Sequence, residues 1–335
     1  MITRDDMDYH LDEMLAATTE ATRYLWSETF YVPFAVPERR LFGCIYLLAR
    51  PGLGAALCDI KVYQGLGRTR PDALYSDNRQ QLPAPQDFSH FTLANGVTVD
   101  LTRGPQRYAI RYEGFDDTAV RLELEALMPP YDIHDPAMDP KARKTTAEQA
   151  SHSGFGASYG GHYDQTCHIK GELILRGETI AIDYVDCMDR SWGPRPEAGC
   201  PGMCWMHAIF GPDYCLHAIW QLDVNAAPDQ QYTFAHGYIL EDGTVHGLTQ
   251  ASMVVERSGI WGAGYALTAT DIRGKQHRFH GAPIASGLWE CYGCVGVLNL
   301  LNRWVAADGR VGYGELQDAV FYDHYANVQA RNRAR

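Results

Sequence analysis

Basic residues are scarce in this sequence and do not cluster. The chain carries 29 Lys and Arg against 41 Asp and Glu, a formal net charge of −12, and no run of Lys or Arg exceeds a pair before the terminal RNRAR. Proteins that bind nucleic acid or anionic membrane surfaces need concentrated positive charge. The acidic balance therefore argues against both classes of partner.

Long apolar runs are missing as well. No window approaches 18 uninterrupted apolar residues, and residues 1–40 show no basic segment followed by an apolar core. A membrane-spanning helix and a signal peptide each need such a run. We therefore expect no membrane span and a cytoplasmic location. An apolar content of 46% is ordinary for a globular protein, which excludes wholesale disorder.

The cysteines are odd in number, nine, so they cannot all pair. In a chain without a signal peptide they are most simply buried free thiols. Cys200 and Cys204, together with Cys291 and Cys294, could offer four thiolates to zinc. However, residues 288–301 read as a strand, in which an odd offset sends Cys291 and Cys294 to opposite faces. We therefore expect no zinc site.

Helical periodicity is nearly absent. Only Asp5–Leu25 has an amphipathic helical pattern, with acidic residues near its start where the helix dipole favours them. The rest reads as short strands about ten residues apart, separated by turn signals such as Asn95-Gly96 and Glu241-Asp242-Gly243. This pattern is typical of antiparallel sandwiches and closed barrels.

A polar stretch containing Pro and Gly divides the chain into two β-rich halves. It runs from about residue 130 to 158 and suits a linker or a loop over a pocket. We place the domain boundary near residue 150, with an N-terminal β-barrel-like domain and its leading helix over 1–150 and a C-terminal β-barrel-like domain over 151–335. The helix could pack on its own barrel or on a second subunit, so a homodimer stays open.

One stretch combines turn signals with a concentration of acid and base groups. Residues 170–184 alternate polar and apolar in two runs joined by Arg176-Gly177, which predicts a β-hairpin. The sequence HYDQ at 162–165 precedes the first run, and DRSWGPR at 189–195 follows the second. A hairpin brings its two ends together. We therefore expect these segments to be neighbours and to form a candidate site.

The same stretch carries a resemblance to a known family. Four segments together resemble the signature of a lipocalin-like (calycin) family: HYDQ at 162–165, GEL at 171–173, GETIAID at 177–183 and DRSWGPR at 189–195. Its members include carotenoid hydratases, a fungal hydratase of an isoflavonoid and fungal Diels–Alder cyclases. Trp26-Ser27-Glu28 resembles the W-x-E of the family's first strand, and DGRVGYGE at 308–315 resembles its closing hairpin.

This resemblance implies a fold and a class of function. The fold is all-β, with two lipocalin-like antiparallel β-barrel or sandwich domains side by side and a deep pocket lined by apolar and aromatic residues. Members act on hydrophobic isoprenoid or polyketide-like molecules as hydratases, dehydratases, isomerases or cyclases. No metal and no organic cofactor is implied, so the expected partner is a small hydrophobic substrate.

The resemblance also implies site residues. In the carotenoid hydratases the catalytic set is a pair made of a His and an aromatic residue, followed further along the chain by the Asp of a D-x-x-W-G motif. That Asp matches Asp189, and the His matches His162. This sequence departs from that set at two positions. The family has an aromatic residue two positions after the His, where this sequence has Asp164, and a Tyr two positions before the Asp, where this sequence has Cys187. These departures indicate a different substrate.

The chemistry can be argued from the residues themselves. Adding water to an unactivated alkene, or removing an alcohol, needs a proton donor beside an apolar cavity. A carboxyl in apolar surroundings has a raised pKa and can supply that proton near neutral pH, while aromatic faces stabilise cationic charge. The candidate catalytic residues are Asp189, His162, Tyr163 and Asp164. The candidate substrate-binding residues are Trp192, Arg190, Trp26, His207 and His217.

Each candidate also has a structural interpretation. Asp189 could form an ion pair with Arg190 or Arg195, which would keep its pKa low and make it a poor acid. Tyr163 and Asp164 point to opposite faces of an extended segment, so at most one of them faces a pocket directly. The remaining structural roles are a barrel plug for Trp192, a hairpin cap for His162, fold support for Trp26, and core packing for His207 and His217.

Three functions fit these residues. The first is a cofactor-independent hydro-lyase or isomerase that acts on a terpenoid- or steroid-like alcohol or alkene. The second is a cyclase that holds a flexible polyene in a reactive shape, where no single acid is essential. The third is a carrier of a hydrophobic ligand without catalysis. The density of ionisable groups at both hairpin ends favours the hydro-lyase, with Asp189 as principal acid and base.

Overall fold

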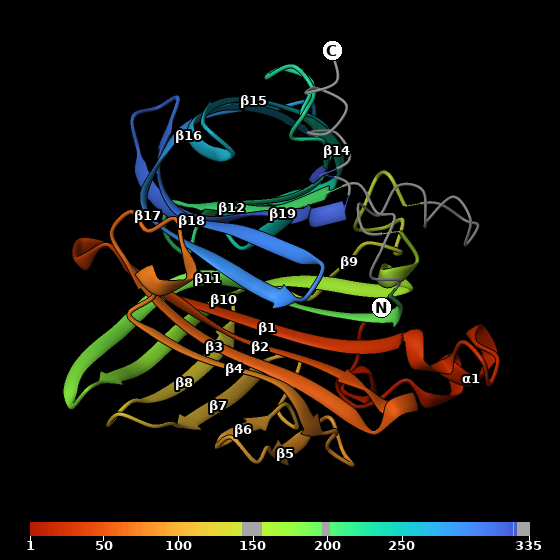
Figure 1. The fold of residues 1–335 in the computed structure, drawn as a ribbon. Coiled ribbons are helices and arrows are strands. Elements are labelled where there is room, and N and C mark those ends of the chain that lie inside the picture. Colours follow the sequence, from red (N-terminus) through yellow and green to blue (C-terminus); the bar gives the residue numbers. More distant parts are fainter. Residues whose placement is uncertain (143–155, 196–201, 324, 327–335) are drawn as a thin grey trace.

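Two antiparallel β-layers are stacked on one another in the computed structural model, which describes residues 1–142, 156–195, 202–323 and 325–326 (Figure 1). The first layer is a curled sheet of eleven strands, and the second is a closed barrel of eight strands. The expected all-β fold, with two barrel-like domains side by side and an N-terminal helix, is confirmed.

The curled sheet has the strand order β4-β3-β2-β1-β11-β10-β8-β7-β6-β5, and β9 pairs with β10. Its strands are β1 (Trp26–Val36), β2 (Leu41–Arg50), β3 (Ala55–Gln64), β4 (Tyr75–Pro83), β5 (His90–Thr92), β6 (Val97–Asp100), β7 (Arg107–Glu113), β8 (Ala119–Ala126), β9 (Tyr131–Asp132), β10 (Gly161–Leu175) and β11 (Glu178–Pro194).

The barrel follows the chain order from β12 to β19 and closes through the pairing of β19 with β12. Its strands are β12 (Gly202–Ile209), β13 (Tyr214–Leu222), β14 (Tyr232–Glu241), β15 (Thr244–Ser258), β16 (Trp261–Asp271), β17 (Gln276–Tyr292), β18 (Val295–Ala306) and β19 (Val311–Phe321). Short 3₁₀ turns complete the structure: η3 (Pro37–Arg39), η4 (Pro51–Leu53), η5 (Arg70–Asp72) and η6 (Gly156–Tyr159).

The N-terminal helix is shorter than the sequence predicted. The expected helix Asp5–Leu25 is divided into η1 (Asp5–Met7), α1 (Leu11–Ala17) and η2 (Arg23–Leu25). Leu11 and Leu15 stay 45% and 52% exposed, so α1 buries too little apolar surface to support a longer helix. Thr18 ends it in an extended conformation and donates its hydroxyl to the Met14 carbonyl at 2.6 Å. Within the described residues, no helix is both long and apolar enough to cross a membrane.

The central hairpin forms as predicted and fixes the register of the candidate segments. β10 and β11 are joined by Arg176-Gly177, both with positive φ. His162 pairs with Ser191, and Asp164 pairs with Asp189, so the two ends of the hairpin do lie side by side. However, this hairpin belongs to the first sheet, between β8 and β1, and not to the second half. The chain passes from the sheet to the barrel between β11 and β12. The domain boundary near residue 150 stays a prediction.

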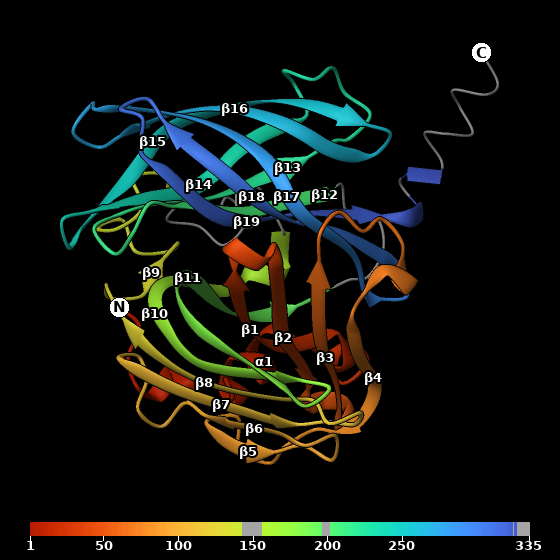
Figure 2. The same cartoon turned by 90° about the vertical axis from the view of Figure 1, so that its left-hand side faces the viewer.

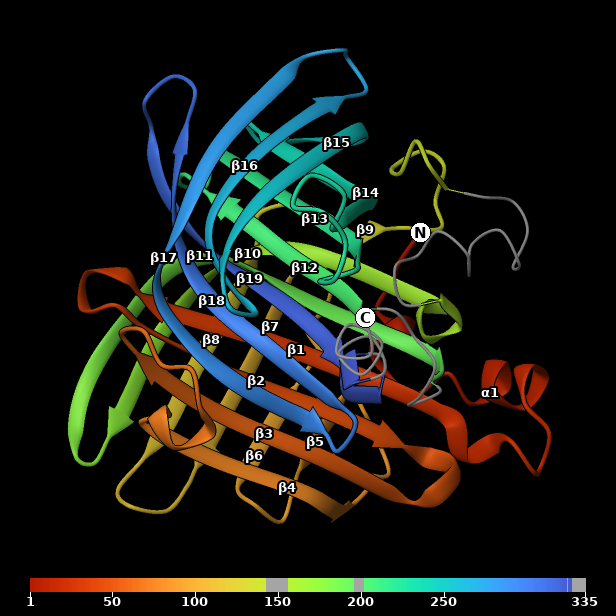
Figure 3. The ribbon, with the colours of Figure 1, turned by 45° about the horizontal axis from the view of Figure 1, so that its top comes forward.

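The three largest apolar cores of the described residues result from this stacking. One fills the concave side of the curled sheet, and another fills the closed barrel. A third, here called the interlayer core, lies between the sheet and the barrel wall and includes Tyr31, Tyr46, Cys187, Trp205 and Trp289. Figures 2 and 3 show the strands of both layers meeting there. Because side chains alternate along a strand, β1 and β11 each send one set into the first core and the other set toward the barrel.

Candidate active site

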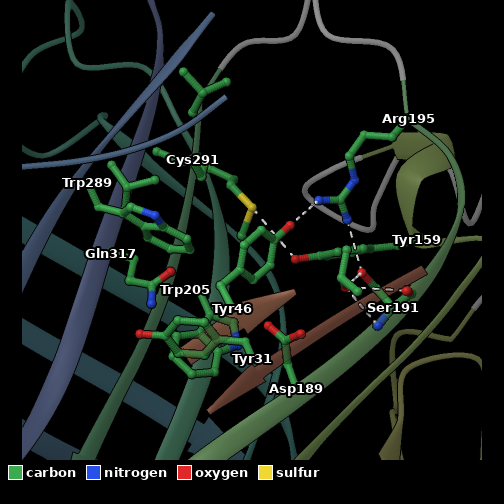
Figure 4. A pocket seen from close by; sticks show the side chains of 15 residues that line it. Tyr31, Tyr46, Tyr159, Asp189, Ser191, Arg195, Trp205, Trp289, Cys291 and Gln317 are labelled. Carbon is green, nitrogen blue, oxygen red and sulfur yellow. Dashed lines mark hydrogen bonds between the residues drawn. The ribbon is translucent and has the colours of Figure 1, made fainter. Parts of the chain in front are cut away.

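A pocket lies between the two layers (Figure 4). The curled sheet contributes Thr29, Tyr31, Tyr46, Asp189 and Ser191 to its wall. The barrel contributes Met203, Trp205, Trp289, Val295, Val297, Gln317 and Ala319. Most of this wall is aromatic or aliphatic, and Asp189 adds a carboxylic acid to it.

Asp189 has the ionisation behaviour that an acid catalyst needs. Burial raises the pKa of Asp189 to about 7. The nearby cations His162 and Arg195 favour the ionised form and limit the rise, while the Asp164 carboxylate adds to it. A carboxyl with this pKa keeps its proton in a large fraction of molecules near neutral pH. The low pKa expected of an ion-paired Asp189 is therefore not found.

His162 and Asp164 lie directly behind the pocket wall and are hydrogen-bonded to each other. The His162 Nε2 is 2.9 Å from an oxygen of Asp164, and both side chains are fully buried. The ring of Tyr159, which lines the pocket, stacks on the His162 ring with centroids 4.0 Å apart. Trp205, also in the pocket wall, donates its Nε1 to the other Asp164 oxygen at 2.8 Å. The pair therefore supports two pocket rings from behind.

The charges of this pair depend on one another. Burial alone would lower the pKa of His162 and raise that of Asp164. The two groups favour each other's charged forms, so the pKa of His162 is raised, and the pKa of Asp164 lies well below its usual range. His217 reinforces the effect, with its Nε2 3.0 Å from an Asp164 oxygen. Asp164 is thus a buried carboxylate and a poor proton donor.

His207 and His217 lie on β12 and β13 and face the curled sheet next to Trp205. They pair across the strands, and the His207 Nε2 is 3.0 Å from an oxygen of Asp186. Burial lowers the pKa of His207 far below its usual value. Neither histidine belongs to the pocket wall. They lie behind it, between the Asp164 and Asp186 carboxyls.

One group of side chains among the described residues has the composition of a metal site. The ligand atoms of Cys187, His207 and His217 lie within 4.8 Å of one another, and all three residues are buried. His207 and His217 already lie 3.0 Å from the Asp186 and Asp164 oxygens, so those carboxylates compete for the same ring nitrogens. The expectation that the protein needs no metal and no cofactor stays a prediction.

Among the described cysteines of the zinc alternative, Cys204 lies in a different core from Cys291 and Cys294. Cys291 is buried in the pocket wall, and Cys294 is only partly buried. Cys204 lies inside the barrel core, and Cys200 lies outside the described residues, as does most of the expected loop after residue 142. Tyr159, just after that gap, does reach the pocket.

Four residues that the sequence analysis assigned to catalysis or substrate binding lie on the opposite face of the sheet. Tyr163 directs its hydroxyl to the Met7 sulfur at 3.4 Å. Arg190 forms a buried ion pair with Glu28 at 3.5 Å, and Trp26 donates its Nε1 to the same carboxylate at 3.1 Å.

Trp192, the fourth, stacks on His10 with ring centroids 3.7 Å apart and donates to Glu13 at 2.9 Å. The alternation of β1 and β11 explains these positions, because Asp189 and Ser191 occupy the pocket face. Trp26, Tyr163, Arg190 and Trp192 hold the N-terminal segment on the first core.

Several pocket residues were not identified from the sequence. Trp205 and Trp289 stand in apolar strands, where tryptophan is ordinary core. The sequence suggests Arg195 only as an ion-pair partner for Asp189. In the structure Arg195 lines the pocket and donates hydrogen bonds to the Tyr46 and Ser191 hydroxyls at 3.2 and 3.0 Å. Tyr31 was not identified from the sequence either. It lies two residues after Thr29 on β1, so both side chains are on the face of that strand that meets the barrel.

Comparison with known families identifies the chain at the level of sequence. Residues 12–319 match the family described as "Domain of unknown function (DUF7064)". The chain belongs to this family. No curated protein matches this DUF7064 member in sequence.

Solved structures resemble this DUF7064 member over most of its length. Kievitone hydratase from Nectria haematococca is 11% identical with a TM-score of 0.51, covering 89% of this chain and 88% of that one. An AttH-like protein from Nitrosomonas europaea is 14% identical with a TM-score of 0.54, covering 95% and 96%. CghA is 10% identical with a TM-score of 0.55, covering 88% of each chain. At these identities the likeness concerns the fold.

Proposed function

We propose that the protein is a cofactor-independent hydro-lyase or isomerase that acts on a hydrophobic, terpenoid- or steroid-like alcohol or alkene in the pocket between the layers. The observation that carries the proposal is Asp189, a partly buried carboxyl with a pKa of about 7 in a largely aromatic wall. Kievitone hydratase shares the fold, and its name describes a hydratase. That likeness agrees with the proposal but supplies no residue roles.

The pocket supplies the two requirements of alkene protonation. The Asp189 carboxylic acid gives its proton to one alkene carbon, so its O–H bond breaks as a C–H bond forms. The other carbon becomes electron-deficient, and the rings of Trp205, Trp289 and Tyr31 present π faces that stabilise positive charge. Water then adds to that carbon and gives up a proton. Run in reverse, the same steps remove water from an alcohol.

The buried network behind the wall has a supporting role in this scheme. Asp164 and His162 hold Trp205 and Tyr159 in place, which fixes the shape of the pocket around the reacting carbons. Their charges also set the pKa of Asp189 from opposite directions. We therefore assign His162 and Asp164 to positioning, and proton donation to Asp189.

Mass spectrometry tests the proposal directly. Purified protein is incubated with a panel of hydroxylated terpenoids and steroids in ordinary and heavy-oxygen water. A product that differs by one water mass, with the heavy label in the hydration direction, is the expected result. Asp189→Asn should lose about 10²–10⁴-fold in turnover because general acid catalysis contributes that much. Asp183→Asn is the matched control, since Asp183 lies exposed on the same strand.

Other outcomes point to other functions. Tight binding of a panel member with no change in mass or retention time would favour a carrier. A new product of unchanged mass that survives Asp189→Asn would favour a cyclase that works by shaping its substrate.

A further inference from the structure

A second buried carboxyl approaches the same pocket from the barrel. Glu315 lies on β19 and is 1% exposed. The Tyr31 hydroxyl lies 2.8 and 2.7 Å from its two oxygens. Tyr31 begins on β1 of the curled sheet, so its side chain crosses the interlayer core and ends at a carboxyl of the other layer. The step assigned to Asp189 uses the ring of Tyr31 but neither its hydroxyl nor Glu315.

Tyr31 is also placed beside Asp189. The two residues are directly paired on β1 and β11, and both line the pocket. Residues paired in this way have Cβ atoms about 5 Å apart and side chains on the same face of the sheet. Figure 4 shows both side chains among the rings of the pocket. The two proton-carrying groups therefore meet the same substrate.

The Tyr31 ring is held firmly on both sides. The Trp205 ring meets it edge-on with centroids 5.2 Å apart, and the Trp289 ring is nearly parallel to it at 5.7 Å. Trp289 is itself fixed by a hydrogen bond from its Nε1 to Asp59 at 3.0 Å. A hydroxyl fixed in this way keeps its direction toward Glu315 during a reaction.

The ionisation of Glu315 suits a partner for Asp189. Burial raises the pKa of Glu315 to about 7, the hydrogen bond from Tyr31 limits that rise, and Asp189 adds to it. Burial and Glu315 together raise the pKa of Tyr31 well above its usual value, so Tyr31 passes protons without becoming a stable phenolate. Neighbouring carboxyls that disfavour each other's charge titrate in separate steps. Near neutral pH, one can hold a proton while the other is ionised.

Other titratable groups face this pair and must be separated from it. Glu315 is faced by Tyr31, Asp189, Asp186 and Cys44. Asp189 is faced by His162, Asp164 and Arg195, and the charge of Arg190 acts on it from the opposite face of the sheet. Burial and the Glu315 charge raise the pKa of Asp186 well above its usual value. Asp186 does not line the pocket.

We propose that Tyr31 is the second catalytic residue of the pocket and that Glu315, acting through it, is the positioning base that receives the proton of the attacking water. This inference rests on the proposed hydro-lyase function. As the C–O bond forms, a water O–H bond breaks and its proton moves to the Tyr31 oxygen, while the hydroxyl proton of Tyr31 moves to Glu315. Asp189 meanwhile ends as a carboxylate. Proton exchange with solvent restores the starting state, and no oxidation or reduction occurs.

The pH profile of kcat/KM distinguishes this role from a structural one. In the hydration direction, activity needs Asp189 protonated and Glu315 ionised, so the wild-type profile should be bell-shaped. Glu315→Gln should lose the acidic limb and about 10²–10⁴-fold in rate. Glu315→Asp should restore the limb with partial activity, and Tyr31→Phe should lose rate like Glu315→Gln. If the enzyme is assayed as a dehydratase, the basic limb should disappear instead.

Two controls keep the result unambiguous. Tyr238→Phe removes a buried tyrosine hydroxyl of the interlayer core, bonded to Thr166 at 2.8 Å, that does not line the pocket. It should keep both limbs, and so should Asp186→Asn. Cooperative thermal unfolding of Tyr31→Phe and Glu315→Gln at temperatures well above that of the assay shows that the losses are not losses of fold.

The possible failures are separable. If wild type turns over no panel member, the proposed function fails. A second outcome overturns only the role of Tyr31 and Glu315. In that outcome wild type turns over substrate and Asp189→Asn abolishes turnover, but Glu315→Gln keeps both limbs of the pH profile and the rate of Tyr31→Phe stays within about threefold of wild type.

Discussion

Replacing Asp189 by Asn should stabilise the protein at alkaline pH while it abolishes activity. The folded carboxyl keeps its proton up to about pH 7, whereas the ordinary pKa of such a group is 3.8. Between these pH values folding takes up a proton, so the contribution of Asp189 to stability falls as pH rises. Asn has nearly the same shape and stays neutral, so it removes this cost.

The size of the effect follows from the pKa difference. About three pKa units correspond to about 4 kcal/mol of destabilisation once pH exceeds the folded pKa. The Asn amide brings two N–H donors into the pocket, and leaving one unpaired costs about 1–3 kcal/mol. We expect Asp189→Asn to be more stable than wild type by about 2 kcal/mol near pH 8. Near pH 5 this advantage should shrink by about 3 kcal/mol, because the folded wild type is then protonated.

Urea denaturation at several pH values measures this difference. Asp183→Asn provides the baseline, because Asp183 lies exposed on the same strand and its pKa is lowered by His168. That variant should stay within about 0.5 kcal/mol of wild type throughout. If the stability difference between Asp189→Asn and wild type does not change between about pH 5 and pH 8, Asp189 does not have a raised pKa, and the argument for it as the acid is refuted.

Three further predictions follow from the contacts of other residues. Tyr163→Phe should leave turnover unchanged and lower the free energy of unfolding in urea by less than about 1 kcal/mol, since its hydroxyl contacts only the Met7 sulfur and Tyr108 on the face away from the pocket. A large fall in kcat at unchanged stability would show that Tyr163 is catalytic after all. Asp164→Asn should lower the free energy of unfolding by about 3–5 kcal/mol at neutral pH, because it leaves the buried His162 imidazolium without its carboxylate. A loss below about 1 kcal/mol in urea denaturation would mean that His162 is neutral in the folded protein. Glu28→Gln should lower the free energy of unfolding by a similar amount, because it breaks the buried ion pair with Arg190. The KM of the enzyme that remains folded should not change, and a raised KM would place this ion pair nearer the substrate.

Much of the fold could be predicted because local signals and the final structure agree. Asp242-Gly243 adopts positive φ between β14 and β15, as expected for a hairpin turn of that composition. The hairpin of β10 and β11 forms as predicted because its two alternating runs meet at Arg176-Gly177. The assignment of that hairpin to a layer could not be predicted in the same way. Pairing of β11 with β1 joins strands about 160 residues apart, and no local pattern encodes it.

The candidate site was predicted in part for a related reason. The sequence placed His162, Asp164 and Asp189 together because the hairpin register is local. It could not say which face of β11 would meet the barrel, and a shift of one residue exchanges the faces. Arg190 and Trp192 were therefore grouped with Asp189, although they face the other core. Glu315 was missed because its partner, Tyr31, lies 284 residues away in the chain.

The position of the pocket between the first core and the barrel core affects how the protein can evolve. The first core and the barrel core each close around their own side chains, and the pocket takes its residues from neither centre but from the boundary between them. A substitution such as Trp289 to a smaller residue therefore reshapes the pocket while both closed cores keep their packing. Selection can act on substrate choice at this boundary almost independently of selection on stability.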